Sequence, residues 1–128
     1  RFQRERQALP AIALTTDTSA LTSIANDYSY ENVFARQVEA LVKEHDIFWA
    51  LSTSGSSKNI IKAAKLAASK GAKIIAFTGR TPSKLEEISD ICLCGESDST
   101  AASQQIHQLA YHIICDLVEW RFARENVD

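Results

Sequence analysis

The sequence of 128 residues contains no methionine, although translation begins with this residue. The chain starts instead with a charged run over residues 1–6, which reads Arg-Phe-Gln-Arg-Glu-Arg. We therefore expect it to be the N-terminally incomplete part of a longer protein, whose upstream residues contribute to the functional site.

Other residue types are also scarce, and each scarcity excludes a class of protein. Four glycines and two prolines are too few for a low-complexity or disordered chain. Three cysteines are typical of a reducing compartment such as the cytoplasm rather than of a disulfide framework. No apolar run approaches the roughly 18 residues that span a bilayer, so we expect no membrane partner.

Charge of one sign is not in excess either. Fourteen Lys and Arg residues stand against 16 Asp and Glu residues, and the net charge is −2. Binding to a nucleic-acid backbone needs clustered positive charge, so we expect no nucleic-acid partner. The hydrophobic content of 45% is typical of globular proteins, and the length predicts a single domain over residues 1–128.

Short apolar runs alternate with helical patterns along the chain. The apolar runs predict buried strands over residues 10–16, 46–51, 73–78 and 90–94. Apolar residues spaced by three and four predict helices over residues 30–44, 57–70 and 100–124. The last helix has a broad apolar stripe and is expected to be well buried. Apolar strands alternating with helices indicate an α/β fold, a doubly wound three-layer sandwich with a parallel sheet.

Hydroxyl side chains crowd the turn after the second predicted strand. Residues 52–57, here called the serine loop, read Ser-Thr-Ser-Gly-Ser-Ser and precede a helix. Open parallel sheets bind ligands beyond the carboxyl ends of their strands, where this turn lies. The free N–H groups of a helix N-terminus attract anions. The loop lacks the Walker and GxGxxG patterns, so a phosphate monoester suits it better than a nucleotide. The alternative is a serine-rich turn with an N-cap and no ligand.

Further polar residues are candidates for ligand binding or catalysis. Asn26 and Asp27 fit either a ligand contact or an ordinary turn at a helix entry. The last helix carries Gln104, His107 and His112, and a histidine can exchange protons near neutral pH, although most helical histidines are structural. Cys92 and Cys94 share one face of a strand and are interpreted as core thiols rather than metal ligands.

Four stretches of the chain together resemble one known family. They are residues 9–14, Asn26 and Asp27 with residues 34–39, the serine loop, and residues 104–107 with His112. These stretches are similar to the sugar isomerase (SIS) domain family and, within it, to bacterial phosphoheptose isomerases. The resemblance extends from Arg1 to about Glu119. It implies a flavodoxin-like or Rossmann-like fold and a cytoplasmic homotetramer with active sites at subunit interfaces.

The resemblance also implies an activity and a role for each matching residue. The activity is the aldose–ketose isomerisation of a seven-carbon sugar phosphate, sedoheptulose 7-phosphate, for heptose and lipopolysaccharide precursor synthesis. The sugar phosphate would be held by Ser52, Thr53, Ser54 and Ser57. Asn26 and Asp27 would contact the sugar. Gln104 would contact substrate or a zinc ion (Zn2+), and His112 would transfer protons or bind zinc.

The chain departs from the family pattern in two places. Ala102 and Gln105 stand where the family commonly has Arg and Glu around the glutamine. The family also has a glycine-rich loop and a helix with His and Glu ahead of the position that matches Arg1, so we expect the 128 residues to show half of a site. Gln104 and His112 would lie about 12 Å apart along a regular helix. Zinc binding by both thus requires that Gln104 precede the helix or that the ligands come from different subunits.

Two other functions remain open from the sequence. One is a non-catalytic SIS protein that binds a replication initiator, and the other is an SIS isomerase or sensor for another sugar phosphate. His112 favours the enzyme over the initiator-binding protein, because such relatives do not keep a histidine at that position. The serine loop does not distinguish one sugar phosphate from another.

Overall fold

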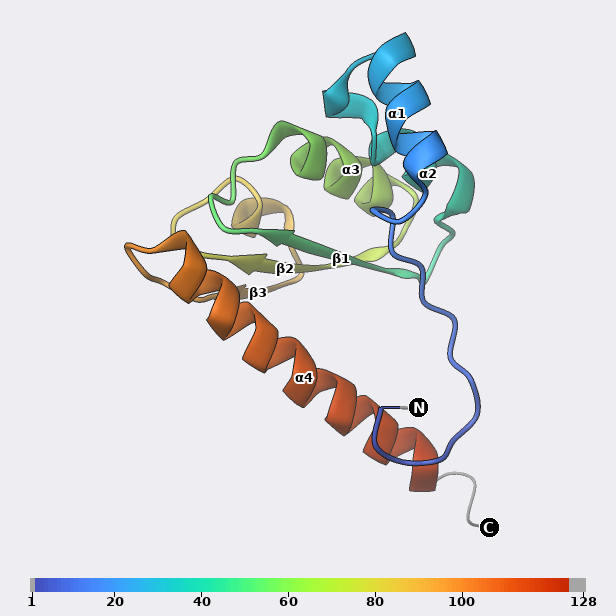
Figure 1. Ribbon diagram of the computed structural model, residues 1–128, viewed down its shortest axis with the longest axis vertical. Coiled ribbons are helices and arrows are strands. Elements are labelled where there is room, and N and C mark those ends of the chain that lie inside the picture. The colour runs from blue at the N-terminus through green and yellow to red at the C-terminus, as the bar shows by residue number, and fades with distance from the viewer. Residues whose placement is uncertain (1, 125–128) are drawn as a thin grey trace.

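A computed structural model of the chain describes residues 2–124 and contains a sheet of three parallel strands flanked by helices (Figure 1). The strands lie in the order β1 (Ile47–Ser52), β2 (Lys73–Thr78) and β3 (Ile91–Cys94). Their register pairs Phe48 with Ile74 and Ala76 with Cys92. The predicted parallel α/β arrangement is confirmed, and the carboxyl ends of all three strands meet at one edge.

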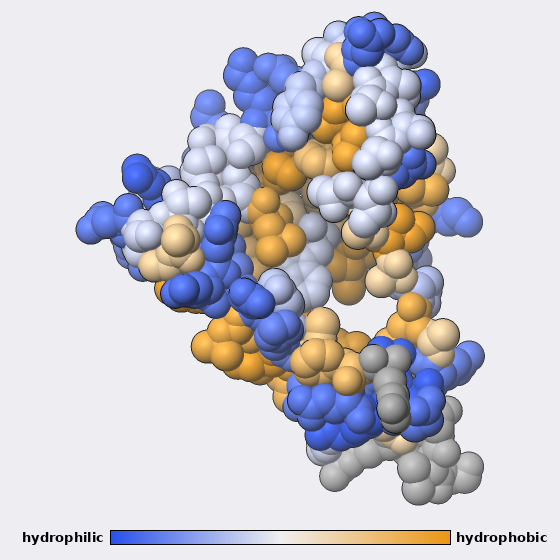
Figure 2. All heavy atoms as spheres, in the orientation of Figure 1, coloured by the Kyte–Doolittle hydropathy of each residue, from blue (hydrophilic) through white to orange (hydrophobic). Residues whose placement is uncertain are grey.

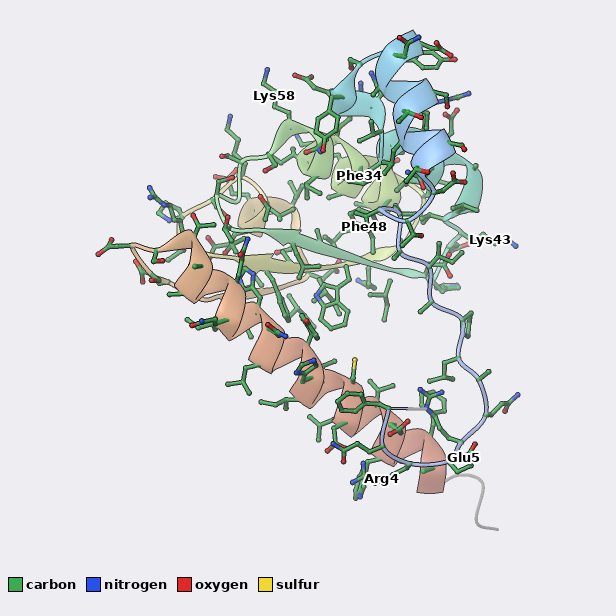
Figure 3. All side chains as sticks on the ribbon, in the orientation of Figure 1. Arg4, Glu5, Phe34, Lys43, Phe48 and Lys58 are labelled. Carbon is green, nitrogen blue, oxygen red and sulfur yellow. The ribbon has the colours of Figure 1, made fainter. Side chains whose placement is uncertain are left out.

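The hydrophobic core lies between the sheet and α3 (Lys58–Ser69), with α2 (Ala35–Leu41) beside it. Alanines on the inner face of α3 are fully buried and are small enough to let the helix approach Phe48 and Ile74. Phe34 packs against the same core, near Phe48 (Figure 3). Burial of a side chain such as Ile74 contributes about 1.5–3 kcal/mol to stability. After α3, Gly71 has a φ of 86° and ends the helix close to the predicted last residue, residue 70.

Residues 10–16 do not form the strand that their apolar run predicts. The N–H of Thr16 donates to the carbonyl of Ala13 at 3.3 Å in a turn, and Ile12 is 70% exposed. Proline and alanine are depleted in strands, and alanine buries little apolar area. The run therefore gains little from pairing with a sheet edge, and the prediction of a strand over residues 10–16 is wrong.

A helix that the sequence analysis missed, α1 (Thr18–Asp27), follows this turn. The carboxylate of Asp17 caps it by accepting the N–H of Ala20 at 2.9 Å. Its apolar stripe is short, with the half-buried Ala20, Leu21, Ile24 and Ala25, and the Thr, Ser and Asn side chains around the stripe weaken the helical signal. The helix predicted over residues 30–44 is shorter than expected, because a 3-10 turn (Tyr30–Asn32) precedes α2.

The last helix, α4 (Thr100–Arg124), has the predicted bounds but is not well buried. It covers the sheet only near its N-terminal end and then runs away from it (Figure 1). Its length of about 37 Å exceeds the roughly 20 Å of a six-residue strand. The C-terminal part of the helix therefore extends beyond the sheet that could cover it. Its exposed apolar side chains include Ile106, Leu109, Ile113, Leu117, Val118, Trp120 and Phe122.

The sheet face toward α4 is likewise only partly covered. Ile47, Leu51 and Ile91 are each between 46% and 64% exposed. Figure 2 shows apolar residues reaching the surface between the sheet and α4. None of the helices within residues 2–124 is long and apolar enough to cross a lipid bilayer.

Candidate functional site

The serine loop is a tight turn held by main-chain hydrogen bonds. The N–H of Gly55 donates to the carbonyl of Ser52 at 2.9 Å, and Thr53 accepts the N–H of Gly79 at 2.9 Å. Gly55 has a φ of 60°, and a Cβ at this position would lie 2.4 Å from Cβ of Ser83. Only glycine therefore fits, and the loop has a defined shape before any ligand binds.

Hydroxyl groups of the loop cluster beside the N-terminus of α3. Oγ of Ser52 donates to Oγ of Ser57 at 3.0 Å and lies 3.5 Å from Oγ of Ser54. The side chain of Ser57 precedes α3 and makes no capping hydrogen bond with it. The positive end of the helix and several hydroxyl donors therefore face the same region, which suits a phosphate group.

Lys58, the first residue of α3, does not add its charge to this cluster. Its side chain points away from the loop (Figure 3), and its Nζ pairs with a carboxylate oxygen of Glu31 at 3.0 Å. Hydroxyl and N–H groups thus supply the polar character of the loop.

A pocket of about 480 Å³ joins the serine loop to the N-terminal half of α4. Its size lies in the range of small-molecule sites. The strand and loop side contributes Leu51, Ser52, Thr53 and Ser57, and α4 contributes Gln104, His107, Gln108 and Tyr111. The structure therefore brings together four of the residues predicted to bind substrate, namely Ser52, Thr53, Ser57 and Gln104. Gln108 and Tyr111 were not singled out by the sequence, because neither belongs to a motif.

His107 has a structural role in this pocket. It is buried, and its Nε2 lies 2.8 Å from the carbonyl oxygen of Thr78, to which it can donate. Its ring packs 5.5 Å from that of Phe77. These contacts fasten the start of α4 to β2 and so place Gln104 beside the serine loop.

His112 lies outside the pocket, two helical turns beyond Gln104. Its imidazole is exposed and stacks on the ring of Phe2, with ring centroids 5.8 Å apart and planes 26° apart. The ring of Tyr111 meets it edge-on at 4.7 Å. The structure therefore does not bring the predicted proton-transfer residue into contact with the serine loop.

Asn26, Asp27 and Ser54 do not line the pocket either. Nδ2 of Asn26 donates to Oδ1 of Asp27 at 2.9 Å, and both residues are exposed at the end of α1. In Figure 1, α1 lies on the far side of α3 from the sheet. Ser54 is exposed and accepts the N–H of Ser56 at 3.2 Å.

A zinc ion would need more ligands than Gln104 and His112. Gln104 lies inside α4 rather than before it, so the two residues are about 12 Å apart along the axis. Catalytic zinc sites use three protein ligands. The part of the chain that the structure describes contains no group of three His, Cys, Asp or Glu residues that could hold a metal. These residues therefore do not fit zinc by themselves.

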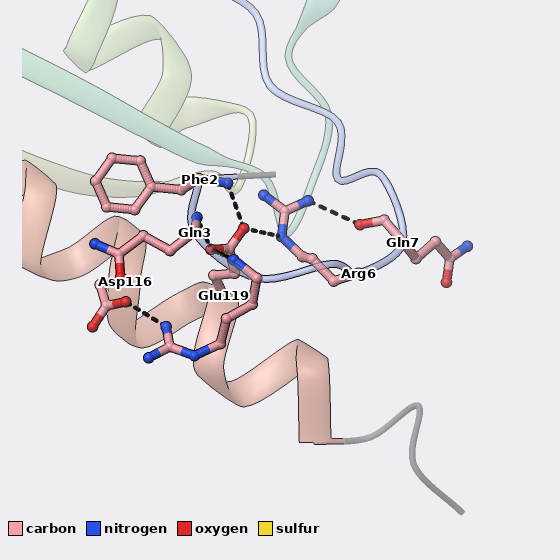
Figure 4. A network of polar contacts seen from close by, with 7 residues as sticks. Phe2, Gln3, Arg6, Gln7, Asp116 and Glu119 are labelled. Atoms are coloured by element: carbon pink, nitrogen blue, oxygen red, sulfur yellow. Dashed lines mark hydrogen bonds and ion pairs between the residues drawn. The ribbon is translucent and has the colours of Figure 1, made fainter.

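Sequence reasoning missed Glu119, which is fully buried near the end of α4. Its carboxylate accepts the N–H groups of Phe2 at 2.5 Å, of Arg4 at 2.6 Å and of Gln3 (Figure 4). We call this arrangement the Glu119 anchor. Arg6 adds its guanidinium, with Nε 3.4 Å from Oε1 of Glu119. No local pattern could reveal the anchor, because its partners lie 115 to 117 residues apart in the chain.

The environment of Glu119 keeps it ionised. Burial alone would raise the pKa of the carboxyl, but the three N–H donors and the charge of Arg6 together lower that pKa to about 2. Beside it, Arg4 pairs with Asp116 on the same helix. The N-terminal segment is thus bound to α4 by a charged group at neutral pH.

The chain is similar to proteins of one family. Residues 1–79 match the SIS domain. The chain is 50% identical over 126 residues to a phosphoheptose isomerase of Helicobacter pylori (strain P12), a match that covers 98% of this chain and 66% of the relative. The chain thus spans slightly less than two thirds of that relative's length.

Solved structures show the same similarity. A phosphoheptose isomerase from Francisella tularensis superposes with a TM-score of 0.86 at 40% identity, covering 90% of this chain and 62% of that one. The phosphoheptose isomerase from Neisseria gonorrhoeae gives 0.81 at 43% identity, with coverages of 84% and 61%. The fold observed here is therefore shared with these two structures.

Proposed function

Since the chain belongs to the SIS domain family, we propose that it acts as a phosphoheptose isomerase that interconverts sedoheptulose 7-phosphate and D-glycero-D-manno-heptose 7-phosphate. The observation that carries the proposal is the pocket that joins Ser52, Thr53 and Ser57 to Gln104. Relatives that share about half of its residues bear this name, and two of the superposed structures bear it as well.

We propose that the serine loop holds the phosphate and that side chains of α4 contact the sugar. Ser52, Thr53 and Ser57 offer hydroxyl groups to phosphate oxygens at the N-terminus of α3, and Gln104 offers its amide to the sugar. Ser54 would join them on binding, and Asn26 and Asp27 would contact the sugar from another copy of the chain.

The proposed reaction moves a proton between C1 and C2 of the sugar. A base takes the proton from C1 of the ketose while the carbonyl oxygen at C2 gains one, which gives an enediol. Return of a proton to C2 and loss of the O1 proton then leave the aldehyde at C1. His112 can exchange such protons near neutral pH.

The position of His112 supports a long substrate. The phosphate is on C7, so the reacting carbons lie at the opposite end of the sugar. His112 lies eight residues beyond Gln104, which is about 12 Å along α4. A base about 12 Å along α4 from Gln104, which lines the pocket together with the serine loop, suits a seven-carbon chain better than a shorter one.

We further propose a cytoplasmic homotetramer with active sites between subunits, acting in the supply of heptose precursors for the cell envelope. The exposed apolar side chains of α4 support an assembly of this kind. Gln104 and His112 of one chain lie too far apart along α4 to share one zinc ion, so a zinc site would need one of them from another subunit together with ligands from outside the described residues.

The test is an isomerase assay of the intact protein on sedoheptulose 7-phosphate beside fructose 6-phosphate and arabinose 5-phosphate. We expect turnover of the seven-carbon sugar and little of the others. Preference for a shorter sugar would indicate another SIS isomerase. A folded protein that binds these sugars without converting any of them would contradict the proposed activity and favour a binding protein.

A further inference from the structure

The imidazole of His112 is held by aromatic rings. Phe2 stacks on one face at 5.8 Å between centroids, and Tyr111 meets the ring edge-on at 4.7 Å. The imidazole is exposed and contacts both of these rings. Tyr111 is its neighbour on the same helix, whereas Phe2 comes from the other end of the sequence. The orientation of His112 therefore depends on where the main chain places Phe2.

The Glu119 anchor places Phe2. The N–H of Phe2 donates to Oε1 of Glu119 at 2.5 Å, and the next two N–H groups donate to Oε2 (Figure 4). Three successive donors on one carboxylate fix the direction of the main chain as well as its position. Glu119 follows His112 by seven residues, so the two side chains leave α4 on the same face, two turns apart.

We propose that Glu119 is a positioning residue for His112: by holding the main chain of residues 2–4, it sets the ring of Phe2 against the imidazole. This inference rests on the proposed isomerase function, in which His112 transfers the proton. Proton transfer requires the base to lie within hydrogen-bond reach of the substrate carbon, and small misplacements reduce the rate strongly.

The charge of Glu119 is the part that a neutral residue cannot replace. The carboxylate is fully buried, and its two oxygens together accept three N–H groups beside the guanidinium of Arg6. An amide of the same size presents one acceptor oxygen and one NH2 group, which would face at least one main-chain N–H. Buried donors that lose their acceptor are costly, so the N-terminal segment would move.

Four variants of the intact protein test the positioning role. Glu119→Gln weakens the anchor, and Phe2→Leu removes the ring while keeping the anchor. Phe2→Tyr restores a ring, and Asp116→Asn changes the neighbouring carboxylate that pairs with Arg4. The readouts are the NMR resonances of the His112 ring, which report stacking by Phe2, together with kcat and KM for sedoheptulose 7-phosphate.

We expect Glu119→Gln and Phe2→Leu to move the His112 resonances toward those of an unstacked histidine. Both should lower kcat by roughly tenfold with KM nearly unchanged, because the base is displaced and the phosphate site is not. Phe2→Tyr and Asp116→Asn should behave as the original protein does. Lowered kcat in Phe2→Leu and recovery in Phe2→Tyr would separate positioning from a loss of fold.

The proposal is overturned if folded Glu119→Gln leaves the His112 resonances and kcat unchanged. Should Glu119→Gln fail to fold, Phe2→Leu decides, since its anchor is intact, and unchanged resonances in that variant overturn the proposal. An original protein without isomerase activity would contradict the proposed function instead. The ring resonances would then still show whether Glu119 positions His112.

Discussion

Single hydroxyl groups of the serine loop should control the affinity for phosphate. Ser57→Ala removes an Oγ that lines the pocket and accepts a hydrogen bond from Ser52 at 3.0 Å. A hydrogen bond to a charged group contributes about 1.5–3 kcal/mol, so the Kd of a sugar phosphate should rise about tenfold or more. Isothermal titration calorimetry measures this. Ser56→Ala, on an exposed residue outside the pocket, should leave the Kd unchanged.

The imidazole of His112 should affect turnover more than binding. His112→Ala is expected to reduce kcat by about a hundredfold or more, which is the usual contribution of acid–base catalysis. Gln105→Ala, an exposed change on the same helix, serves as the control. If steady-state kinetics show the same kcat for both variants, His112 takes no part in proton transfer.

The carboxyl of Glu119 should make stability depend on pH in the acidic range. Its pKa in the folded chain is about 2, below the ordinary value of 4.5. The ionised form is thus favoured by folding, and its contribution is present above about pH 4.5 and is lost as the pH falls toward 2. Melting temperatures of the original protein and of Glu119→Gln should therefore converge between pH 5 and pH 2. A constant difference across this range would argue against the anchor.

At the scale of elements, the turn between β1 and α3 depends on one glycine. Gly55→Ala should lower stability by about 2 kcal/mol, because φ is positive and the new Cβ would meet Ser83. Urea unfolding measures the change. The double variant Gly55→Ala with Ser83→Gly should recover part of the loss, since it removes the steric contact and leaves the strained φ. No recovery would mean that backbone strain alone is responsible.

The sequence predicted the elements whose signals are local. The strands β1, β2 and β3 were found because their apolar runs are short and bounded by polar residues, and α3 because its stripe ends at Gly71. The strand predicted over residues 10–16 is absent, because proline and alanine make up much of this run and most of its residues stay exposed. The burial of α4 was overestimated because a stripe shows which face is apolar and not what covers it.

The placement of the candidate site residues was predictable only where it depends on local signals. Ser52, Thr53 and Ser57 of the serine loop line the pocket, because a parallel sheet binds ligands at the carboxyl ends of its strands, and Gln104 on α4 lines it from the other side. The Glu119 anchor could not be found, since one glutamate carries no local signature of the main-chain N–H groups that it accepts. The positions of Asn26 and His112 relative to the loop depend on tertiary packing, and a sequence motif gives no such distance.

At the scale of the whole molecule, the apolar face of α4 should drive self-association. Contiguous apolar surface beyond a few hundred Å² usually marks an interface. The charged substitutions Ile113→Glu and Leu117→Glu together should lower the mass of the assembly, measured by light scattering, because a buried unpaired charge is costly. Both residues are more than half exposed, so the helix content should stay unchanged.

Lys65→Glu, an exposed change on α3, provides the control for this experiment. We expect the original chain and the control to form the proposed tetramer, and the double variant to dissociate. A monomeric original protein would contradict the assembly. An unchanged mass of the double variant would place the interface elsewhere.

The Glu119 anchor also has a kinetic consequence. It joins residues 115 to 117 positions apart, so it closes nearly the whole described chain into a single loop. We expect contacts of such separation to form late in folding, after the sheet and α3 have assembled from nearer partners. An interaction absent from the transition state acts on the unfolding rate and hardly on the folding rate. We therefore expect Glu119 to govern the lifetime of the folded state rather than the speed at which that state is reached.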